Sequence, residues 1–232
     1  MRALYVIPAR GGSKGIPGKN LREIAGKPLF IHTLDIARQM ASDEDICLST
    51  DDINIIAAAE KADYKPPFIR PAFLATDTTG MQEVLMHALE FYASEGKNYD
   101  SIVLLQPTSP FRQVADIERA AENYTHDCDM VVSVKETDAN PYYVLFEENT
   151  QGFLLKSKEG NFSRRQDCPK VWQLNGAIYI INVRSLIEKG FSGFTKIKKS
   201  EMDILHSLDL DTELDWRMAL LINEQYRILP HE

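Results

Sequence analysis

Apolar and polar residues follow a regular alternation of short strands and amphipathic helices along most of the chain. Short apolar runs predict strands at Ala3–Ile7, Asp45–Ser49, Ser101–Leu105, Met130–Val134 and Ala177–Val183. Apolar residues at helical spacing predict helices at Ile31–Met40, Ile53–Ala62, Gln82–Ser94, Asp116–Tyr124 and Glu213–Tyr226, the second of them capped by Thr50 or Asp51. Strands that alternate with helices favour an α/β fold, in which helices cover both faces of a mainly parallel sheet.

The alternation stops between Glu136 and about Gln173. Turn signals there favour extended hairpins, and they lie at Pro141, Asn149–Gly152 and Glu159–Asn161. An isolated hairpin is only marginally stable in water, so a β-rich excursion at about 138–172 can pack on a second subunit. An ordinary hairpin of the protein core is an equally good interpretation. Because the chain contains no internal repeat or linker, residues 1–232 are expected to form one domain with this excursion inserted.

Composition and charge narrow the class of protein. Hydrophobic residues make up 44% of the 232 residues and charged residues 26%, which is ordinary for a globular domain. A formal charge of −8 argues against a general nucleic-acid binder. No apolar run is long enough to span a bilayer, and the first residues lack the pattern of a signal peptide. Three widely spaced cysteines favour neither a disulfide framework nor a zinc cluster, so we expect a reduced cytoplasmic protein.

The segment Ile7–Asn20 combines four glycines with three cations directly after the first predicted strand. Glycines allow backbone amides to turn toward an anion, and the cations Arg10, Lys14 and Lys19 can neutralise phosphate oxygens. The P-loop motif does not fit, because Ser13 stands where that motif has a glycine, and the dinucleotide-binding spacing does not fit either. The segment therefore predicts a loop that holds a nucleotide triphosphate. A flexible glycine loop with solvated lysines is the alternative.

The segment Leu104–Arg112 leaves another predicted strand and is stiffened by two prolines. It presents three hydrogen-bonding side chains, those of Gln106, Thr108 and Ser109. Arg112 can bind an anion, but an ion pair with Asp116 is the favoured interpretation. This segment, the glycine-rich loop and Ser49–Asp52 all follow the carboxyl ends of predicted strands, so they are expected to converge on one crevice.

Paired aspartates precede the last predicted helix. In an extended segment Asp209 and Asp211 point to the same face, and a bound Mg²⁺ would relieve their repulsion while a triphosphate supplied further oxygen ligands. Aspartate pairs are also common in turns, so a turn without a metal is an equal alternative. Thr212 and Asp215 have the spacing of a helix-capping box, which is compatible with both interpretations.

Other segments give weaker signals. Arg164 and Arg165 can bind a carboxylate, or can pair with the nearby acids Glu159 and Asp167. Arg70 and Thr79 lie in a loop without a regular pattern, where they can contact a base.

Taken together and in order, these motifs resemble those of the CMP-N-acylneuraminate synthetase (acylneuraminate cytidylyltransferase) family. The matching segments read IPARGGSKGIPGKN, STDD, RP–LA, LLQPTSPFR, RRQDCP, NGAIY and SLDLDTELD, and they extend from Ile7 to Asp215. The combination is specific, although no single motif would suffice. The resemblance implies a three-layer α/β/α nucleotidyltransferase domain, of the nucleotide-diphospho-sugar transferase type, with a dimerisation excursion and hence a homodimer.

The resemblance also implies a reaction, in which CMP is transferred from CTP to the anomeric hydroxyl of a nine-carbon 2-keto sugar acid of the sialic acid type. Pyrophosphate is released in this reaction, and the implied cofactor is Mg²⁺. Catalytic roles are implied for Arg10, Lys19, Asp209 and Asp211, the two aspartates being the Mg²⁺ ligands. Nucleotide binding is implied for Ala9, Arg10, Gly11, Gly12, Lys14, Lys19, Asn20, Arg70 and Thr79. Sugar binding is implied for Gln106, Thr108, Ser109, Arg165, Gln166 and Asn175, of which Arg165 and Gln166 can serve the neighbouring subunit's site.

Three rival functions remain open. Cytidylyltransferases for legionaminic or pseudaminic acid act on related acid sugars, whereas the Kdo-activating enzymes share the opening IPAR but usually continue differently. A nucleotide-binding protein without activity is disfavoured because the cations, Gln106 and both aspartates are retained. A nucleotide-sugar glycosyltransferase would be expected to carry its paired aspartates after a middle strand. The expected partners are CTP, an acid sugar and a second copy of the chain, with neither nucleic acid nor a membrane among them.

Overall fold

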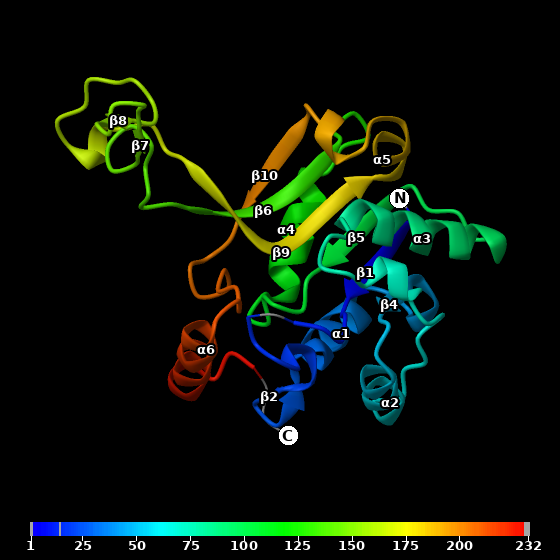
Figure 1. Cartoon of the computed structure of the whole chain (residues 1–232). Coiled ribbons are helices and arrows are strands. Elements are labelled where there is room, and N and C mark those ends of the chain that lie inside the picture. The colour runs from blue at the N-terminus through cyan, green and yellow to red at the C-terminus, as the bar shows by residue number, and fades with distance from the viewer. Residues whose placement is uncertain (1, 14, 230–232) are drawn as a thin grey trace.

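Six strands form one sheet in the order β10-β6-β9-β5-β1-β4 in the computed structural model, which describes residues 2–13 and 15–229 (Figure 1). The strands are β1 (Ala3–Pro8), β4 (Ile46–Ser49), β5 (Ser101–Leu105), β6 (Met130–Glu136), β9 (Trp172–Asn182) and β10 (Ile197–Glu201). Strand β9 runs antiparallel to β5 and β6, and the other five strands share one direction. The mainly parallel sheet predicted from the sequence is confirmed.

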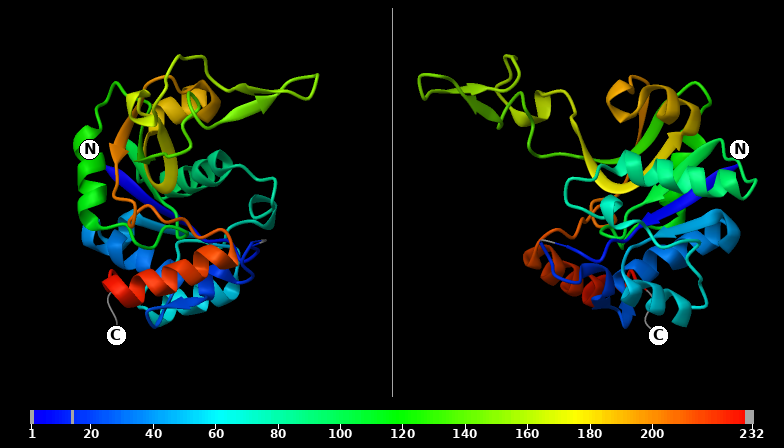
Figure 2. Two further views of the ribbon diagram at one scale, coloured as in Figure 1. Left: turned by 90° about the vertical axis from the view of Figure 1, so that its left-hand side faces the viewer. Right: turned by 45° about the vertical axis from the view of Figure 1, so that its right-hand side comes forward.

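Helices cover both faces of this sheet and complete the predicted three layers (Figure 2). Helices α1 (Leu29–Met40), α2 (Ile53–Lys61) and α4 (Val114–Asn123) contribute to one buried apolar cluster. Helices α3 (Met81–Ser94) and α5 (Val183–Lys189) contribute to the cluster on the opposite face. The last helix, α6 (Glu213–Tyr226), packs Trp216 in a third cluster with Ile16 and Phe111. In the part of the chain that the structure describes, none of the helices has the length and apolar character to cross a membrane.

The chain leaves the sheet between β6 and β9 and forms a protruding arm (Figures 1 and 2). Strands β7 (Phe146–Glu148) and β8 (Leu154–Lys156) pair antiparallel within it, and the turn predicted at Asn149–Gly152 joins them. Apolar side chains of this hairpin are exposed to between 46% and 65%, and they belong to Phe146, Phe153, Leu154 and Leu155. The arm therefore presents apolar surface that the rest of the chain leaves uncovered.

Sequence patterns missed the elements with little apolar content. Strand β10 lies at an edge of the sheet and buries one of its five residues, Ser200, so its sequence has no apolar face. Helix α5 is seven residues long, and β2 (Glu23–Ile24) and β3 (Lys27–Pro28) form a minimal pair. The predicted cap of α2 was wrong: Asp52, rather than Thr50 or Asp51, accepts a hydrogen bond of 2.7 Å from the Asn54 amide.

A buried carboxylate joins α5 and β10 to the sheet. Asp129 precedes β6 and is 1% exposed, and its oxygens accept hydrogen bonds from Lys189 Nζ (2.5 Å) and Ser185 Oγ (2.7 Å) and from the amides of Thr195 and Lys196 (both 2.9 Å). The Lys189 ammonium and these donors hold the pKa of Asp129 well below its usual range. Because the folded state prefers the charged form, this contribution to stability is complete above the unfolded pKa of about 3.9 and is lost as the pH falls below it.

We therefore expect Asp129→Asn to lower the urea midpoint of unfolding at pH 7 and to flatten the decline of stability between about pH 5 and pH 2, since the titrating carboxylate is gone. The measurement is urea unfolding across this range, with Glu122→Gln, an exposed position on α4, as the matched control. An acid decline as steep in Asp129→Asn as in the parent chain would contradict this assignment.

Candidate active site

The carboxyl ends of the parallel strands meet at one edge of the sheet, where a cleft of about 360 Å³ opens. Eight of the residues singled out from the sequence line it, namely Arg10, Lys19, Asn20, Arg70, Thr79, Gln106, Thr108 and Asp211. They come from the loops after β1 and β5, from the connection between α2 and α3, and from the connection that leads to α6. Lys14 lies outside the described residues. The glycine-rich loop and the loop after β5 converge on the cleft as predicted, whereas Ser49–Asp52 does not line it and instead supports Gly11 and Arg70.

Lys19 connects the glycine-rich loop to the paired aspartates. Its side chain is 11% exposed, and Nζ donates to the Leu210 carbonyl oxygen at 2.6 Å and lies 3.2 Å from Asp211 Oδ1. Gly18, at φ 64°, turns the backbone so that a short 3₁₀ helix begins at Lys19. Asn20 Nδ2 donates to the Arg10 carbonyl oxygen at 2.9 Å and closes the loop on itself. The loop is therefore held in shape by its own polar groups.

Two glycines are required because other chain segments pass close to them. A Cβ on Gly15 would lie 2.1 Å from the Asp211 carbonyl oxygen, and one on Gly11 would lie 2.5 Å from Asp52 Oδ2. The Gly11 amide donates to Asp51 Oδ1 at 3.1 Å, so in this structure it bonds to the protein. Of the predicted nucleotide contacts, Ala9, Gly11 and Gly12 do not line the cleft.

Arg10 faces an acid that the sequence analysis missed. Its Nη1 lies 2.9 Å from Asp77 Oδ1, and both side chains are partly exposed at the cleft. Asp77 belongs to a loop in which Thr76 Oγ1 lies 2.7 Å from Thr79 Oγ1, and Thr79 in turn donates to the Phe73 carbonyl oxygen at 3.0 Å. A single acid among loop threonines carries no sequence signal, since such residues are common in turns.

Arg70 is fixed at the end of β4. It is 4% exposed, its Nε donates to Ser49 Oγ at 3.0 Å, and its Nη2 donates to the Ser49 carbonyl oxygen. Burial lowers the pKa of Arg70, and the nearby Asp51 carboxylate opposes this shift. The guanidinium is thus a preorganised cation in the wall of the cleft.

Asp209 and Asp211 stand in different environments. Asp211 is exposed and faces Lys19, whereas burial raises the pKa of Asp209, an effect that a hydrogen bond from Thr108 opposes and the Asp211 charge reinforces. Asp209 Oδ1 is buried without a hydrogen-bond partner among the described residues. Within the same residues, no three His, Cys, Asp or Glu side chains gather to hold a metal by themselves. Asp211 lines the cleft and Asp209 does not, but the unpartnered Asp209 Oδ1 fits a cation that takes its other ligands from a phosphate chain.

Several predicted residues have other surroundings. Arg112 is fully buried and donates to the carbonyl oxygens of Ala177 and Gln106 (both 2.7 Å) and to Thr33 Oγ1, so the predicted pairing with Asp116 was wrong. Burial lowers its pKa to about 9. Asn175 and Ser109 are buried and bonded inside the protein and do not line the cleft.

Arg165 and Gln166 lie at the base of the protruding arm and outside the cleft. Arg165 pairs with Asp138, and its neighbour Arg164 pairs with Asp167 at 2.8 Å, as one of the two sequence interpretations expected. Within its own chain, the arm therefore contributes neither predicted sugar contact to the cleft.

The sheet order, the covering helices and the cation-lined edge define a nucleotidyltransferase-like α/β protein. The chain belongs to the cytidylyltransferase family, whose model matches residues 4–230. It is 37% identical to the CMP-N,N'-diacetyllegionaminic acid synthase of Legionella pneumophila, over 94% of this chain and 95% of that one. It is 33% identical to an N-acylneuraminate cytidylyltransferase of Streptococcus agalactiae, over 93% of this chain and 52% of that one. A solved CMP:2-keto-3-deoxy-manno-octonic acid synthetase complexed with CTP shares the fold, with a TM-score of 0.69, 19% identity and coverage of 97% of this chain and 100% of that one.

The contact at Gly15 is open to a direct test. Gly15→Ala places a methyl group against the Asp211 backbone, so the free energy of unfolding is expected to fall by about 1 to 3 kcal/mol. Gly12→Ala is the matched control, because a Cβ there meets nothing within 4 Å, and its effect is expected to stay below about 0.5 kcal/mol. Chemical denaturation measures both, and equal effects would show that the loop does not pack on Asp211.

Proposed function

We propose that this protein transfers CMP from CTP to the anomeric hydroxyl of a nine-carbon 2-keto sugar acid of the legionaminic acid type and releases pyrophosphate. One observation carries the proposal: three cations, Arg10, Lys19 and Arg70, line a single cleft together with Gln106, Thr108 and Asp211. The cations match a triphosphate in charge. The polar groups of the β5 loop line the same cleft, where they could contact a second substrate.

Arg10 and Lys19 would bind the phosphate oxygens. Each already lies against a carboxylate, Asp77 and Asp211 respectively, so each cation keeps a compensating charge when no nucleotide is bound. A triphosphate carries more negative charge than either carboxylate and can make charge-assisted hydrogen bonds to both cations at once. Arg70, held by Ser49, would contribute fixed positive charge without having to move.

Asp209 and Asp211 would hold Mg²⁺ together with phosphate oxygens, which gives Asp209 Oδ1 the partner that it lacks among the described residues. When bound, the ion neutralises charge on the phosphates and on the departing pyrophosphate. The sugar hydroxyl oxygen forms a bond to the α-phosphorus, the bond from that phosphorus to the oxygen bridging to the β-phosphorus breaks, and the hydroxyl proton passes to solvent. The protein's part in this step is to align the two substrates and to stabilise the charge that develops.

The choice of sugar rests on the relatives. A sialic acid was the main expectation from the sequence, but the legionaminic acid alternative has better support. The legionaminic acid synthase is the more similar of the two relatives and matches this chain along almost its whole length, whereas this chain spans about half of the N-acylneuraminate enzyme. Both sugars are acids with the same reacting hydroxyl, so the same cleft chemistry would serve either.

We also propose a homodimer built through the protruding arm. The exposed leucines and phenylalanines of the β7–β8 hairpin would then be covered by a second copy, which removes apolar surface from water. In such a dimer, Arg165 and Gln166 could approach the partner's cleft, which neither reaches within its own chain.

Pyrophosphate release from CTP and Mg²⁺ tests the reaction, with sialic, legionaminic, pseudaminic and Kdo sugars as acceptors. We expect release with a nine-carbon acid and the highest kcat/KM for legionaminic acid. Asp211→Asn should lower kcat roughly 100- to 1,000-fold, as loss of one charge-stabilising group typically does. Glu224→Gln, an exposed position on α6, is the matched control. No release with any sugar would contradict the function, and near-normal turnover of Asp211→Asn would contradict its metal role.

Sedimentation tests the dimer. The double substitution Leu154→Asp and Leu155→Asp puts charges on the exposed hairpin and is expected to shift the full chain from dimer to monomer, because the buried charges would be unpaired. Leu220→Asp with Leu221→Asp, on the exposed side of α6, is the control and should leave the dimer intact. A parent chain that sediments as a monomer at micromolar concentration would overturn the proposal.

A further inference from the structure

Both candidate metal ligands lie on a connection without regular secondary structure, residues 202–212, which links β10 to α6. A loop can hold ligands in a fixed position only when neighbouring elements fix the loop itself. This need is sharpest for Asp209, whose Oδ1 has no hydrogen-bond partner among the described residues. The contacts that fix the loop just before Asp209 therefore bear on the metal site.

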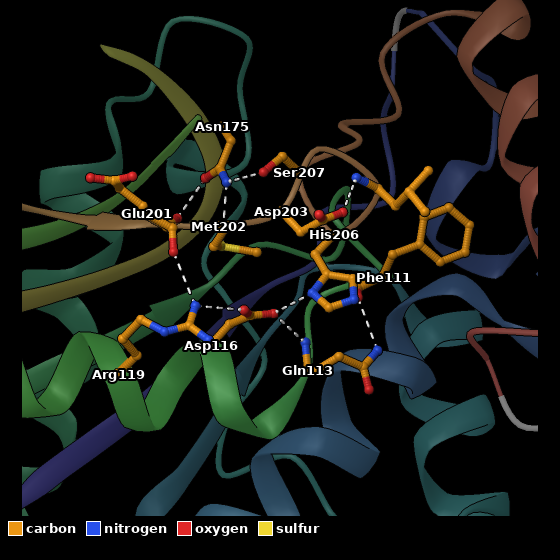
Figure 3. Close-up of polar contacts among 12 residues, drawn as sticks. Phe111, Gln113, Asp116, Arg119, Asn175, Glu201, Met202, Asp203, His206 and Ser207 are labelled. Atoms are coloured by element: carbon orange, nitrogen blue, oxygen red, sulfur yellow. Dashed lines mark hydrogen bonds and ion pairs between the residues drawn. The ribbon is translucent and has the colours of Figure 1, made fainter. Parts of the chain in front are cut away.

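The first contact joins His206 to the start of α4 (Figure 3). His206 Nδ1 lies 3.0 Å from Asp116 Oδ2, and the Asp116 side chain is 3% exposed. The same oxygen accepts a hydrogen bond of 2.9 Å from the Gln113 amide as part of a capping box. Arg119 Nη1 lies 3.3 Å from Asp116 Oδ1 and donates to the Glu201 carbonyl oxygen at 3.0 Å. Asp116 is thus a buried carboxylate that α4 holds in place, and His206 Nδ1 lies against it at ion-pair distance without making a hydrogen bond among the described residues.

The second contact lies one residue further along (Figure 3). Asn175 Nδ2 donates to Ser207 Oγ at 2.9 Å, and its Oδ1 accepts a hydrogen bond of 2.6 Å from Ser133 Oγ. All three residues are buried, so this contact attaches the loop to β9 and β6 in the interior of the protein. The contact between this loop and α4 is made instead by His206, which is half-buried.

We propose that His206 is a positioning residue for the metal site, and that its contact with the Asp116 carboxylate fixes the loop that carries Asp209 and the cleft-lining Asp211. The inference rests on the proposed function for the role of the two aspartates. Helix α4 begins directly after the loop that presents Gln106 and Thr108, so Asp116 also ties the metal side of the cleft to the sugar side. A substitution at His206 would therefore weaken metal binding more than it lowers the stability of the fold.

Three substitutions separate this role from simple packing. His206→Asn places an amide nitrogen where Nδ1 stands and keeps the contact with Asp116, although it is much smaller than histidine. His206→Gln nearly preserves the volume but moves its amide away from that position. His206→Ala removes both the contact with Asp116 and the volume of the side chain. A packing role predicts that Gln is the better replacement, whereas a positioning role through Nδ1 predicts that Asn is.

The readout is the affinity of Mn²⁺, used as the probe ion, in the presence of CTP and without sugar, measured as free Mn²⁺ by electron paramagnetic resonance. We expect His206→Ala and His206→Gln to weaken Mn²⁺ roughly tenfold, as loss of a group supporting a metal ligand typically does, and His206→Asn to stay within about twofold of the parent. His126→Ala, an exposed position outside the loop 202–212, is the control and should bind Mn²⁺ as tightly as the parent chain. If His206→Ala does not fold, the Asn and Gln variants alone decide.

Three outcomes would overturn the inference. The first is that His206→Gln keeps the Mn²⁺ affinity of the parent while His206→Asn loses it. The others are that all the variants bind Mn²⁺ as tightly as the parent, or that His206→Asn, His206→Gln and His206→Ala all lose the same affinity. Absence of Mn²⁺ binding in the parent chain would overturn it as well. Pyrophosphate release by the parent chain is measured in parallel. A parent that turns over while His206 has no effect on Mn²⁺ refutes the positioning role alone, and a parent that releases no pyrophosphate refutes the proposed function.

Discussion

The ammonium group of Lys19 makes the contact on which the rest of the site depends. It reaches the Leu210 carbonyl oxygen at 2.6 Å and Asp211 at 3.2 Å, and so joins positions that are 191 and 192 residues apart in the chain. Gly15 lets the same loop lie directly against the Asp211 backbone. The first loop and the last connection thus form one wall, and a cation faces the carboxylates that a metal would need. Because Lys19 is largely buried, removing its partners would leave an unpaired charge at high cost.

A second general feature is that oxygen atoms of the protein already fix each of the three cations of the cleft in position. Arg10 lies against Asp77, Lys19 lies against Asp211, and Arg70 is bound by the oxygens of Ser49. Fixed charges of this kind need little rearrangement when a substrate develops charge during a reaction. They also explain how a chain with a net charge of −8 can attract an anion, because the cations are gathered at one edge of the sheet.

Sequence patterns predicted the parts of the fold that have strong apolar periodicity. Helix α6 was predicted at Glu213–Tyr226, where the structure has it, because Thr212 and Asp215 form the capping box that the sequence spacing indicated. Strand β10 was missed because this edge strand, with two adjacent lysines and a glutamate among its five residues, buries almost nothing. Several site residues from motifs at strand ends line the cleft, among them Arg10, Lys19 and Gln106, because parallel strands end at the same edge of the sheet, whereas Gly11 and Ser109 from the same motifs do not. Asp77 was missed and Asn175 was misplaced because their surroundings are set by tertiary contacts that spacing along the chain does not encode.

The proposed reaction depends most directly on where a triphosphate binds. A crystal structure of the chain with CTP and Mg²⁺ would show this. We expect the phosphate oxygens between Arg10 and Lys19, the Arg10–Asp77 contact opened, and the metal ion against Asp209 and Asp211. A triphosphate bound elsewhere, or one bound in the cleft while Arg10 keeps its contact with Asp77 and the metal stands away from both aspartates, would contradict the account.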